Sequence, residues 1–300
     1  MKILIFGGKG QLGYELVQQG LALGHAVKAP LETQTNIVDI DEVKRTIDTH
    51  QPSLVINSAA YTAVDKAETE KKIAFAVNKT GAANLARCCA PAQIPLIQIS
   101  TDYVFDGQKG APYLETDPIS PIGIYGRSKA DGEAEIRSHL YKHIIIRTSW
   151  LYGVHGHNFV KTMLKLVREK ELIQVVADQH GSPTSALDLA EAVLIICGQI
   201  ENRRAINWGT FHYCGQGITT WHEFAEKILE LSRLKDNVKT ARIEPLSTAE
   251  YPTAATRPQF SALDCNRITH SFGIKPKPWR ESLKRVIEII YSPSDEAKNP

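Results

Sequence analysis

A tyrosine and a lysine, Tyr125 and Lys129, stand four residues apart in the stretch YGRSK at the expected start of a helix. Residues at this spacing share one helical face, with roughly 5–6 Å between their Cβ atoms. A free phenol titrates near pH ~10, and a cation about 4 Å away can lower that pKa by roughly 1–3 pH units inside a protein. The spacing therefore predicts a phenol that exchanges a proton near working pH. By itself the pair is a weak motif, because a surface tyrosine often precedes a surface lysine.

A second candidate site lies near the N-terminus, where Gly7, Gly10 and Gly13 follow a strand-like segment and open a helix-like one. Glycines at this spacing allow a tight turn and a close approach of the backbone to a pyrophosphate, while the helix N-terminus offers free N–H groups to the anion. The pattern predicts a dinucleotide site. A nucleoside triphosphate P-loop is excluded, because no Gly-Lys-Ser/Thr sequence follows at the required spacing.

The sequence leaves open which dinucleotide binds there. An acidic residue about 20 positions further along usually holds the adenosine ribose and favours NAD. Here Pro30 stands where that acid is expected, and Glu32 follows two residues later. Lys9 or Lys28 can instead meet the 2′-phosphate of NADP, so the predicted cofactor is NADPH or NADH.

The bulk composition excludes several classes of protein. The 300 residues are 43% hydrophobic and 23% charged with a formal net charge of +2, which gives no reason to expect nucleic acid as a partner. We find no secretory signal, and no apolar run approaches the roughly 18 residues of a membrane span. Five cysteines without metal-ligand spacing indicate reduced thiols. We therefore expect a cytoplasmic protein that binds no membrane.

Short β-branched segments alternate with amphipathic ones through the first half of the chain, as in KILIFG followed by QLGYELVQQGLALG. Strands this apolar are typical of a parallel sheet covered on both faces, so the sequence predicts an α/β, doubly wound Rossmann-type fold. One long helical run covers residues 68–90, and the charged residues 65–72 are interpreted as its solvated start.

The second half of the chain is mostly helical, with proline-rich loops and a capping box at Thr220 and Glu223. We expect a dinucleotide-binding domain over residues 1–149 and a mainly substrate-binding domain over residues 150–300. Parts of residues 172–210 are expected to return to the sheet, so that the boundary interdigitates. Ligands should bind at the carboxyl edge of the sheet, which the second domain covers.

Taken in their order along the chain, these motifs resemble the extended short-chain dehydrogenase/reductases, and more narrowly the dTDP-4-dehydrorhamnose reductase family. The glycine motif carries part of the resemblance, and further stretches extend it over almost the whole chain. They are NSAAYTAVDKAE (57–68), STDYVFDG (100–107), PIGIYGRSK (121–129), RTSWLYG (147–153), DQHGSPTS (178–185) and YPTAATRP (251–258).

The resemblance implies an enzyme that uses NADPH or NADH to reduce the C4 ketone of a dTDP-linked 6-deoxyhexulose, dTDP-4-dehydrorhamnose. Matching positions give Thr101, Tyr125 and Lys129 as the catalytic set. Besides Tyr125 and Lys129, the residues expected at the cofactor are Gly7, Gly10, Gln11, Leu12, Gly13, Asp39, Ile40, Ala59, Ala60 and Tyr61. Those expected at the dTDP-sugar are Thr62, Tyr103, Trp150 and Arg257.

The chemistry of several of these residues can be weighed directly. Thr101 ends an apolar strand, so its hydroxyl can polarise a ketone at the ligand edge, or merely satisfy a turn. Tyr103 and Trp150 have rigid faces that suit a deoxysugar, although such aromatics usually lie in a core. The guanidinium of Arg257 matches a diphosphate, with a surface salt bridge as the rival interpretation.

Some members of the family are dimers bridged by magnesium through glutamates. Glu15 is present here, but Leu187 stands where the second glutamate would be. A hydrophobic side chain cannot ligate a hard cation. We therefore expect no bridging metal, and a monomer or a weak homodimer.

Two other functions stay open at this stage. A nucleotide-sugar epimerase or dehydratase of the same superfamily also uses Tyr-x-x-x-Lys, but recycles NAD without net redox change. Dehydratases tend to pair acids beside the threonine, whereas here only Asp102 stands there. A non-catalytic, dinucleotide-binding regulatory subunit is the second alternative, because a fold alone does not certify an activity.

Overall fold

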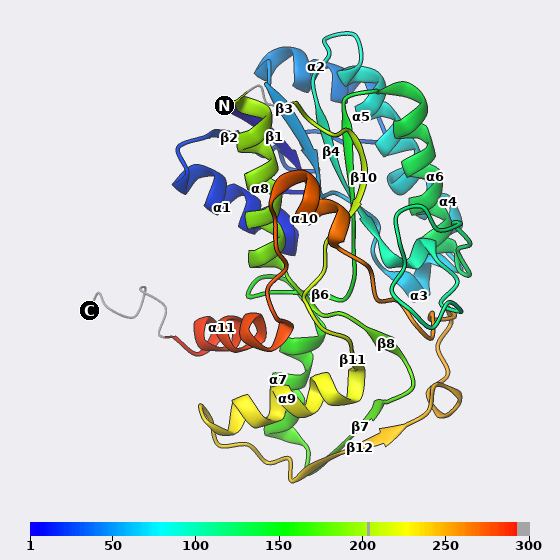
Figure 1. Cartoon of the computed structure of the whole chain (residues 1–300), viewed down its shortest axis with the longest axis vertical. Coiled ribbons are helices and arrows are strands. Elements are labelled where there is room, and N and C mark those ends of the chain that lie inside the picture. Colours follow the sequence, from blue (N-terminus) through cyan, green and yellow to red (C-terminus); the bar gives the residue numbers. More distant parts are fainter. Residues whose placement is uncertain (203–204, 293–300) are drawn as a thin grey trace.

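The computed structural model describes residues 1–202 and 205–292, and a six-stranded parallel sheet forms its upper half (Figure 1). The strand order is β10-β5-β4-β3-β1-β2, and every neighbouring pair is parallel. The strands are β1 (Lys2–Phe6), β2 (Ala26–Lys28), β3 (Leu54–Asn57), β4 (Leu96–Thr101), β5 (His143–Thr148) and β10 (Gly209–His212). This confirms the predicted doubly wound parallel sheet.

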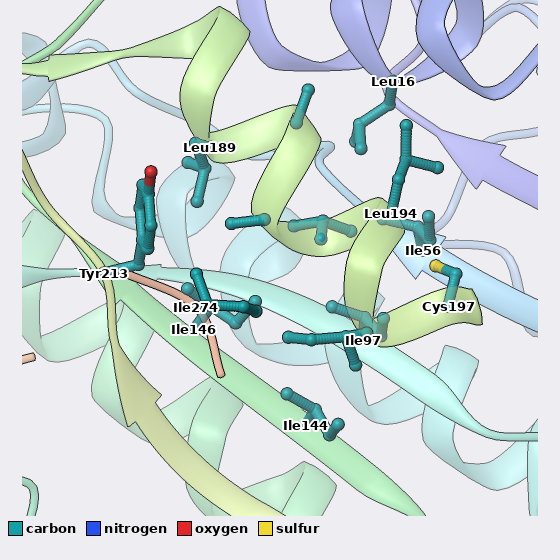
Figure 2. Packing of buried hydrophobic residues seen from close by; sticks show 14 of the residues in the cluster. Leu16, Ile56, Ile97, Ile144, Ile146, Leu189, Leu194, Cys197, Tyr213 and Ile274 are labelled. Carbon is teal, nitrogen blue, oxygen red and sulfur yellow. The ribbon is translucent and has the colours of Figure 1, made fainter. Parts of the chain in front are cut away.

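Helices cover both faces of the sheet, which explains why its strands show no polar alternation. On one face, Ile3 and Ile5 of β1 pack with α1 (Gln11–Ala22), α8 (Ala186–Glu201) and α10 (Asn266–Phe272). Figure 2 shows part of this cluster, including Leu16 of α1 and Leu189 of α8. On the other, Leu4 and Phe6 pack with α2 (Ile40–His50), α5 (Ala82–Cys89) and α6 (Ile124–His139). Successive strand residues point to opposite faces, so the central strand β1 contributes apolar side chains to both.

The chain reverses its direction of winding next to β1. Strand β2 pairs with one edge of β1 and β3 with the other, so the connections on either side run in opposite directions. In open α/β sheets, ligands bind outside the carboxyl ends of the strands at such a switch point. Gly7 follows β1 and Ser58 follows β3, so both lie at this position.

The predicted single helix over residues 68–90 is wrong in detail. The segment contains α4 (Lys71–Phe75), a π-helical turn η1 (Ala76–Gly81) and then α5, and a separate short α3 (Val64–Ala67) precedes it. A π-helical turn inserts an extra residue into the helix and is common at functional sites. The turn contains Asn78, whose buried side chain contacts α6 as described below.

The lower region is built around three helices, α7 (Phe159–Glu169), α9 (Trp221–Arg233) and α11 (Trp279–Tyr291) (Figure 1). A parallel pair of strands, β7 (Leu172–Val176) and β12 (Arg242–Leu246), lies beside them and was not expected from the sequence. Smaller elements are β6 (Leu151–Tyr152), β8 (His180–Gly181), β9 (Thr184–Ser185), β11 (Thr219–Thr220) and η3 (Thr248–Glu250). Between these elements the chain goes back to the sheet, where α8 packs on α1 and β10 pairs with β5.

Only one half of the predicted capping box forms. Thr220 caps α9 and accepts a hydrogen bond from the N–H of Glu223 at 3.1 Å. The carboxylate of Glu223 accepts instead from the hydroxyl of Thr219, at 2.7 Å. Among the residues that the structure describes, no helix is both long and apolar enough to cross a membrane.

Candidate active site

The end of β4 and the start of α6 bring the three predicted catalytic side chains together. Thr101 ends β4 and caps the short helix η2 (Asp102–Val104), whereas Tyr125 and Lys129 lie in the first turns of α6. A Cβ at Gly126 would lie 2.0 Å from the carbonyl oxygen of Tyr103. Only glycine therefore lets α6 approach the loop after β4 this closely, and this approach places the phenol beside Thr101.

Thr101 is buried, and its hydroxyl has defined partners. The hydroxyl oxygen accepts from the N–H of Tyr103 at 3.2 Å, and the hydroxyl donates to a carboxylate oxygen of Asp102 at 3.0 Å. The other carboxylate oxygen of Asp102 is buried and has no hydrogen-bond partner among the residues that the structure describes. Burial raises the pKa of Asp102 to about 6. Sequence analysis did not identify Asp102 as part of this network.

Tyr125 is half-buried, with its ring edge-on to that of Tyr103 at a centroid distance of 5.5 Å. Burial raises the pKa of Tyr125 to about 12, the hydroxyl of Thr101 lowers it by hydrogen bonding, and the charge of Asp102 raises it. The predicted lowering of this pKa by Lys129 is therefore wrong for the protein alone. Desolvation outweighs the neighbouring groups, and the phenol keeps its proton at neutral pH.

The contacts of Lys129 explain why its ammonium does not lower the pKa of the Tyr125 phenol. Its Nζ donates to the carbonyl oxygen of Ile99 in β4 at 2.7 Å, and the side chain is buried. Burial lowers the pKa of Lys129 to about 8, while the charge of Glu133 raises it. An ammonium has three donors, so two remain for other partners.

A buried asparagine that sequence analysis missed fixes this part of the site. Asn78, in the π-helical turn η1, donates to the hydroxyl oxygen of Ser128 in α6 and to the carbonyl oxygen of Tyr61, at 2.9 and 3.0 Å. Its own side-chain oxygen accepts from the N–H of Tyr61 at 2.9 Å. The extra residue of the turn aims this side chain at α6. A lone asparagine inside a helical run gives no such signal in the sequence.

A buried ion pair ties α6 to the sheet. Glu133 and Arg147 are 1% and 2% exposed and form two hydrogen bonds, of 2.7 and 2.9 Å. Glu133 also accepts from the hydroxyl of Ser100, the residue before Thr101, at 2.6 Å. This pair therefore connects β5, β4 and the helix that carries Tyr125.

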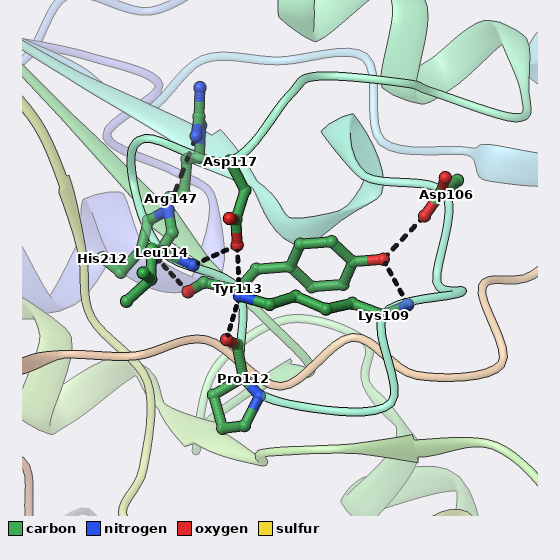
Figure 3. Close-up of polar contacts among 8 residues, drawn as sticks. All are labelled: Asp106, Lys109, Pro112, Tyr113, Leu114, Asp117, Arg147 and His212. Carbon is green, nitrogen blue, oxygen red and sulfur yellow. Dashed lines mark hydrogen bonds and ion pairs between the residues drawn. The ribbon is translucent and has the colours of Figure 1, made fainter.

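The loop between η2 and α6 is held by its own polar contacts (Figure 3). The Tyr113 hydroxyl donates to Asp106 at 2.7 Å, and Lys109 pairs with Asp117. The imidazole of His212 hydrogen-bonds the carbonyl oxygen of Tyr113 at 3.1 Å. Burial lowers the pKa of His212 to about 3, so the ring is neutral near pH 7.

A cavity of about 270 Å³ lies at the switch point of the sheet. Gly7 and Gly10 line it together with Ala59 and Ala60 from the end of β3. Gly7 has φ +83°, and a Cβ there would lie 2.4 Å from the backbone nitrogen of Ala59. No side chain caps the N-terminus of α1 at Gly10, which leaves N–H groups of its first turn free for an anion.

Both Lys9 and Glu32 line this cavity, whereas Lys28 lines a neighbouring one of about 440 Å³ beside α2 with Arg45 and His50. Groups suited to a ribose diol and to a 2′-phosphate thus lie at the same end of the site. The residues themselves do not decide between NAD and NADP.

The remaining predicted cofactor residues lie in several places. Gln11 accepts from the amide of Asn158 at 2.9 Å, and Leu12 is buried in the core. Asp39 caps α2, and Ile40 is 42% exposed. The hydroxyl of Tyr61 donates to Glu70 at 2.7 Å. None of these side chains lines the 270 Å³ cavity beside Gly7 and Gly10, so their contact with a cofactor stays a prediction. The third glycine of the motif, Gly13, lies in the first turn of α1.

A second cavity, of about 310 Å³, opens between the sheet edge and the lower region. Tyr103 and Arg257 line it from one side, and Phe159, Met163 and Trp221 from α7 and α9 line it from the other. The structure thus brings two of the four predicted substrate residues to one cavity. Trp221, a third aromatic wall of this cavity, was missed because it begins an ordinary amphipathic helix.

Trp150 lies behind that cavity rather than in its lining. It stacks on Trp221 at a centroid distance of 3.7 Å and has φ +46°, a strained backbone conformation for so large a residue. Such strain persists where the surroundings fix it, often at ligand sites. Thr62, the fourth predicted substrate residue, is exposed and does not line the second cavity.

Arg257 already has a carboxylate partner. Its guanidinium pairs with Asp65 at 2.7 Å, so the charged run at residues 65–72 is more than a solvated helix start. Asp65 also accepts from the N–H of Ala255 at 3.1 Å. The ion pair that was the rival interpretation of Arg257 is therefore present, and Arg257 also lines the cavity.

Glu15 and Leu187 mark the place where some family members bind a bridging metal. Glu15 is buried, which raises its pKa, and Gln19 donates to the carbonyl oxygen of Leu187 at 3.1 Å. Within residues 1–202 and 205–292, no group of three or more His, Cys, Asp or Glu side chains is placed to hold a metal ion.

The sequence of the chain matches a known protein family and several characterised proteins. The model of a family described as the RmlD substrate binding domain matches residues 1–292. The chain is 39% identical over 289 residues to the dTDP-4-dehydrorhamnose reductase of Aggregatibacter actinomycetemcomitans, covering 95% of this chain and 98% of that protein.

Solved structures extend the likeness to the whole fold. A dTDP-4-dehydrorhamnose reductase from Clostridium acetobutylicum has a TM-score of 0.90 and 38% identity, covering 97% of this chain and 99% of that one. The protein of the same name from Bacillus anthracis, in complex with NADP, has a TM-score of 0.88 and 37% identity, covering 95% and 98%. The likeness therefore extends over at least 95% of this chain.

Proposed function

The chain belongs to the dTDP-4-dehydrorhamnose reductase family, and we propose that it reduces the C4 ketone of dTDP-4-dehydrorhamnose to dTDP-L-rhamnose through Thr101, Tyr125 and Lys129. It is an NAD(P)H-dependent oxidoreductase. One observation carries the assignment of residues: the phenol of Tyr125 lies beside Thr101 at the carboxyl edge of the sheet, and Tyr103, edge-on to that phenol, lines the second cavity.

The residues at the switch point fit a nicotinamide dinucleotide. Gly7 leaves the space that a Cβ would fill, and the uncapped start of α1 offers N–H groups to a pyrophosphate. Ala59 and Ala60 would line the adenosine end, and Lys129 has donors left for the nicotinamide ribose. When bound, the reduced cofactor supplies the hydride that reaches C4 of the sugar.

The side chains of the protein supply the proton that completes the reduction. Reduction leaves an alkoxide on the sugar, a base strong enough to take the proton of Tyr125, whose pKa burial raises to about 12. The Thr101 hydroxyl has a single proton, which it donates to Asp102 in the structure. Turned to the ketone oxygen of a bound substrate, this hydroxyl would polarise the carbonyl. The phenolate that forms on Tyr125 is stabilised by hydrogen bonding with the hydroxyl of Thr101.

The second cavity suits the nucleotide part of the substrate. Phe159, Met163 and Trp221 offer apolar and aromatic surface to a base, and Arg257 offers a planar fork to a diphosphate. The ion pair of Arg257 with Asp65 holds that fork in place before the substrate binds. The chain is further proposed to act as a monomer or a weak homodimer without a bridging metal.

An absorbance assay at about 340 nm tests the function directly. Net oxidation of NADPH or NADH with dTDP-4-dehydrorhamnose, one cofactor at a time, is expected, and the ratio of the two rates gives the cofactor preference. Purified protein that carries stoichiometric NAD and consumes none would instead indicate an epimerase or dehydratase. Tight dinucleotide binding without turnover would indicate a regulatory subunit.

Replacing Thr101 by valine is expected to lower kcat by about 10²–10³-fold, as the loss of one donor to a developing oxyanion typically does. Valine keeps the shape of the side chain but removes the hydroxyl that lies beside the phenol. The affinity for NADPH, measured by quenching of protein fluorescence, should stay within about threefold. Equal losses in turnover and in cofactor affinity would show that Thr101 only supports the fold.

The second-order rate constant kcat/KM is expected to fall as the pH rises through about 8. Burial lowers the pKa of Lys129 to about 8, so the ammonium is present below that pH and lost above it. The pH dependence of kcat/KM reports groups of the free enzyme. Initial rates between about pH 6 and 10 should show this basic limb, which Lys129→Met should abolish together with most of the activity. A constant kcat/KM up to pH 10 would contradict this assignment.

A further inference from the structure

Two thiols meet directly behind the candidate active site, and the mechanism above uses neither. Cys214 follows β10 and Cys265 precedes α10, 51 positions later, yet their Sγ atoms lie 3.6 Å apart. The N–H of Cys214 donates to the sulfur of Cys265 at 3.3 Å, and both sulfurs lie within hydrogen-bond distance of the carbonyl oxygen of Leu263, at 3.6 and 3.8 Å. Backbone groups as well as side chains therefore hold the two sulfurs together.

The chemistry of this pair differs from that of the other cysteines. Cys89 and Cys197 are fully buried, and burial raises the pKa of each to about 12. The hydrogen bond between the two thiols lowers the pKa of Cys214 and, together with burial, raises the pKa of Cys265 well above its usual range, so Cys214 is the thiol of the pair that favours the reactive thiolate. Cys265 is half-buried and gives a small reagent access to the pair.

We infer that Cys214 and Cys265 form an oxidative modification site, at which a two-electron oxidant of the peroxide class joins them in a reversible disulfide. Both S–H bonds and the O–O bond of hydrogen peroxide break, one S–S bond forms, and two molecules of water leave. The two sulfurs are oxidised and the two peroxide oxygens are reduced. A dithiol reductant reverses the step by exchange. Where proteins of reducing compartments contain disulfides, these are usually of this transient, redox-sensing kind.

The position of the pair links its oxidation to the active site. Cys214 packs in one cluster with Val104, Phe105, Tyr113 and Leu263, and Cys265 lies against it. Val104 belongs to η2, the short helix that Thr101 caps. Forming a bond of about 2.05 Å requires the sulfurs to come roughly 1.5 Å closer. A close-packed interior passes such a shift to its neighbours.

The expected consequence is a slower enzyme, a statement that rests on the proposed function. Displacing a catalytic group by about 1 Å can cost up to about 10²-fold in rate. The cross-link also closes the segment that contains Trp221 and Arg257, which line the second cavity. We expect turnover to fall by about 10- to 100-fold on oxidation and to recover fully with dithiothreitol.

The covalent step is tested by counting thiols in the full-length protein. After treatment with hydrogen peroxide, titration of the unfolded protein with Ellman's reagent should fall from five thiols to three. A digest without reductant should contain the peptides of Cys214 and Cys265 joined, with the loss of two hydrogen masses. Five remaining thiols, or a different pair joined, would overturn the inference. This readout needs no enzymatic activity.

Variants test the consequence. Cys265→Ser and Cys214→Ser should keep their turnover under peroxide, whereas Cys88→Ser, outside the pair, should lose it as the wild type does. If one serine variant fails to fold, comparison of the other variant with the wild type still shows whether the loss of turnover under peroxide requires the pair. Cross-linking without a change in turnover would overturn the link to the active site. A reduced wild-type protein without reductase activity would overturn the proposed function instead, and the thiol count would still decide the chemistry of the pair.

Discussion

Replacing Tyr125 by phenylalanine is expected to lower kcat by about 10²–10⁴-fold, the usual contribution of a general acid. Only the hydroxyl is lost, so the ring keeps its edge-on contact with Tyr103. Because burial holds the pKa of this phenol at about 12, it is protonated throughout the working range and serves as the donor in the reducing direction. Steady-state rates of NADPH oxidation measure the effect.

Two comparisons separate this role from a structural one. The affinity of Tyr125→Phe for NADPH, measured by fluorescence titration, should change by less than about threefold. Tyr152→Phe is the matched control, since Tyr152 is equally aromatic and more deeply buried, with its hydroxyl 3.5 Å from the carbonyl oxygen of Trp279. Its kcat should stay near that of the wild type. A Tyr125→Phe variant with more than a tenth of wild-type turnover would exclude Tyr125 as the proton donor.

The architecture of the sheet was predictable because several local signals agree. Residues 3–6 and 54–56 are apolar at every position and therefore on both faces, as a doubly covered parallel sheet requires. Strands β7 and β12 escaped prediction because they form a small sheet of their own beside α9, and Leu172 and Arg242 at their starts are exposed. Pairing between strands 70 residues apart leaves no local trace in the sequence.

The candidate catalytic set was predictable in membership but not in electrostatics. Helical spacing fixes the distance between the Cβ atoms of Tyr125 and Lys129, and says nothing of where the ammonium points. In the structure Lys129 is turned to the carbonyl oxygen of Ile99, and desolvation dominates both pKa values. A prediction from charge proximity alone therefore had the wrong sign for the phenol.

Other parts of the site depend on contacts between distant segments. Asn78 reaches Ser128 only because a π-helical turn rotates it inward, and Trp221 reaches the second cavity only because α9 packs beside α7. Asp65 and Arg257, which are 192 positions apart, form an ion pair. Each of these residues has an ordinary sequence context, so no local pattern singles it out.

Glu133→Gln is expected to lower the free energy of unfolding by about 3–5 kcal/mol, the usual cost of removing one partner of a buried ion pair. Arg147 is 2% exposed and would keep its charge without a carboxylate. Ser100 would keep an acceptor, but the hydrogen bonds from Arg147 to both carboxylate oxygens would be weakened or lost. Equilibrium unfolding in urea, followed by circular dichroism, gives the value.

Glu135→Gln is the matched control on the same helix, because Glu135 pairs with Arg87 and His139 at the surface and should contribute about 1 kcal/mol or less. The double variant Glu133→Leu/Arg147→Met should recover most of the loss, since apolar side chains of similar volume often replace a buried pair without cost. Such a variant would fold while no longer tying Ser100 to α6. If turnover then fell although stability recovered, the ion pair would be shown to position Thr101 and Tyr125 as well as to stabilise the fold. A Glu133→Gln variant no less stable than Glu135→Gln would mean that the charge of Arg147 finds other partners when its carboxylate is lost.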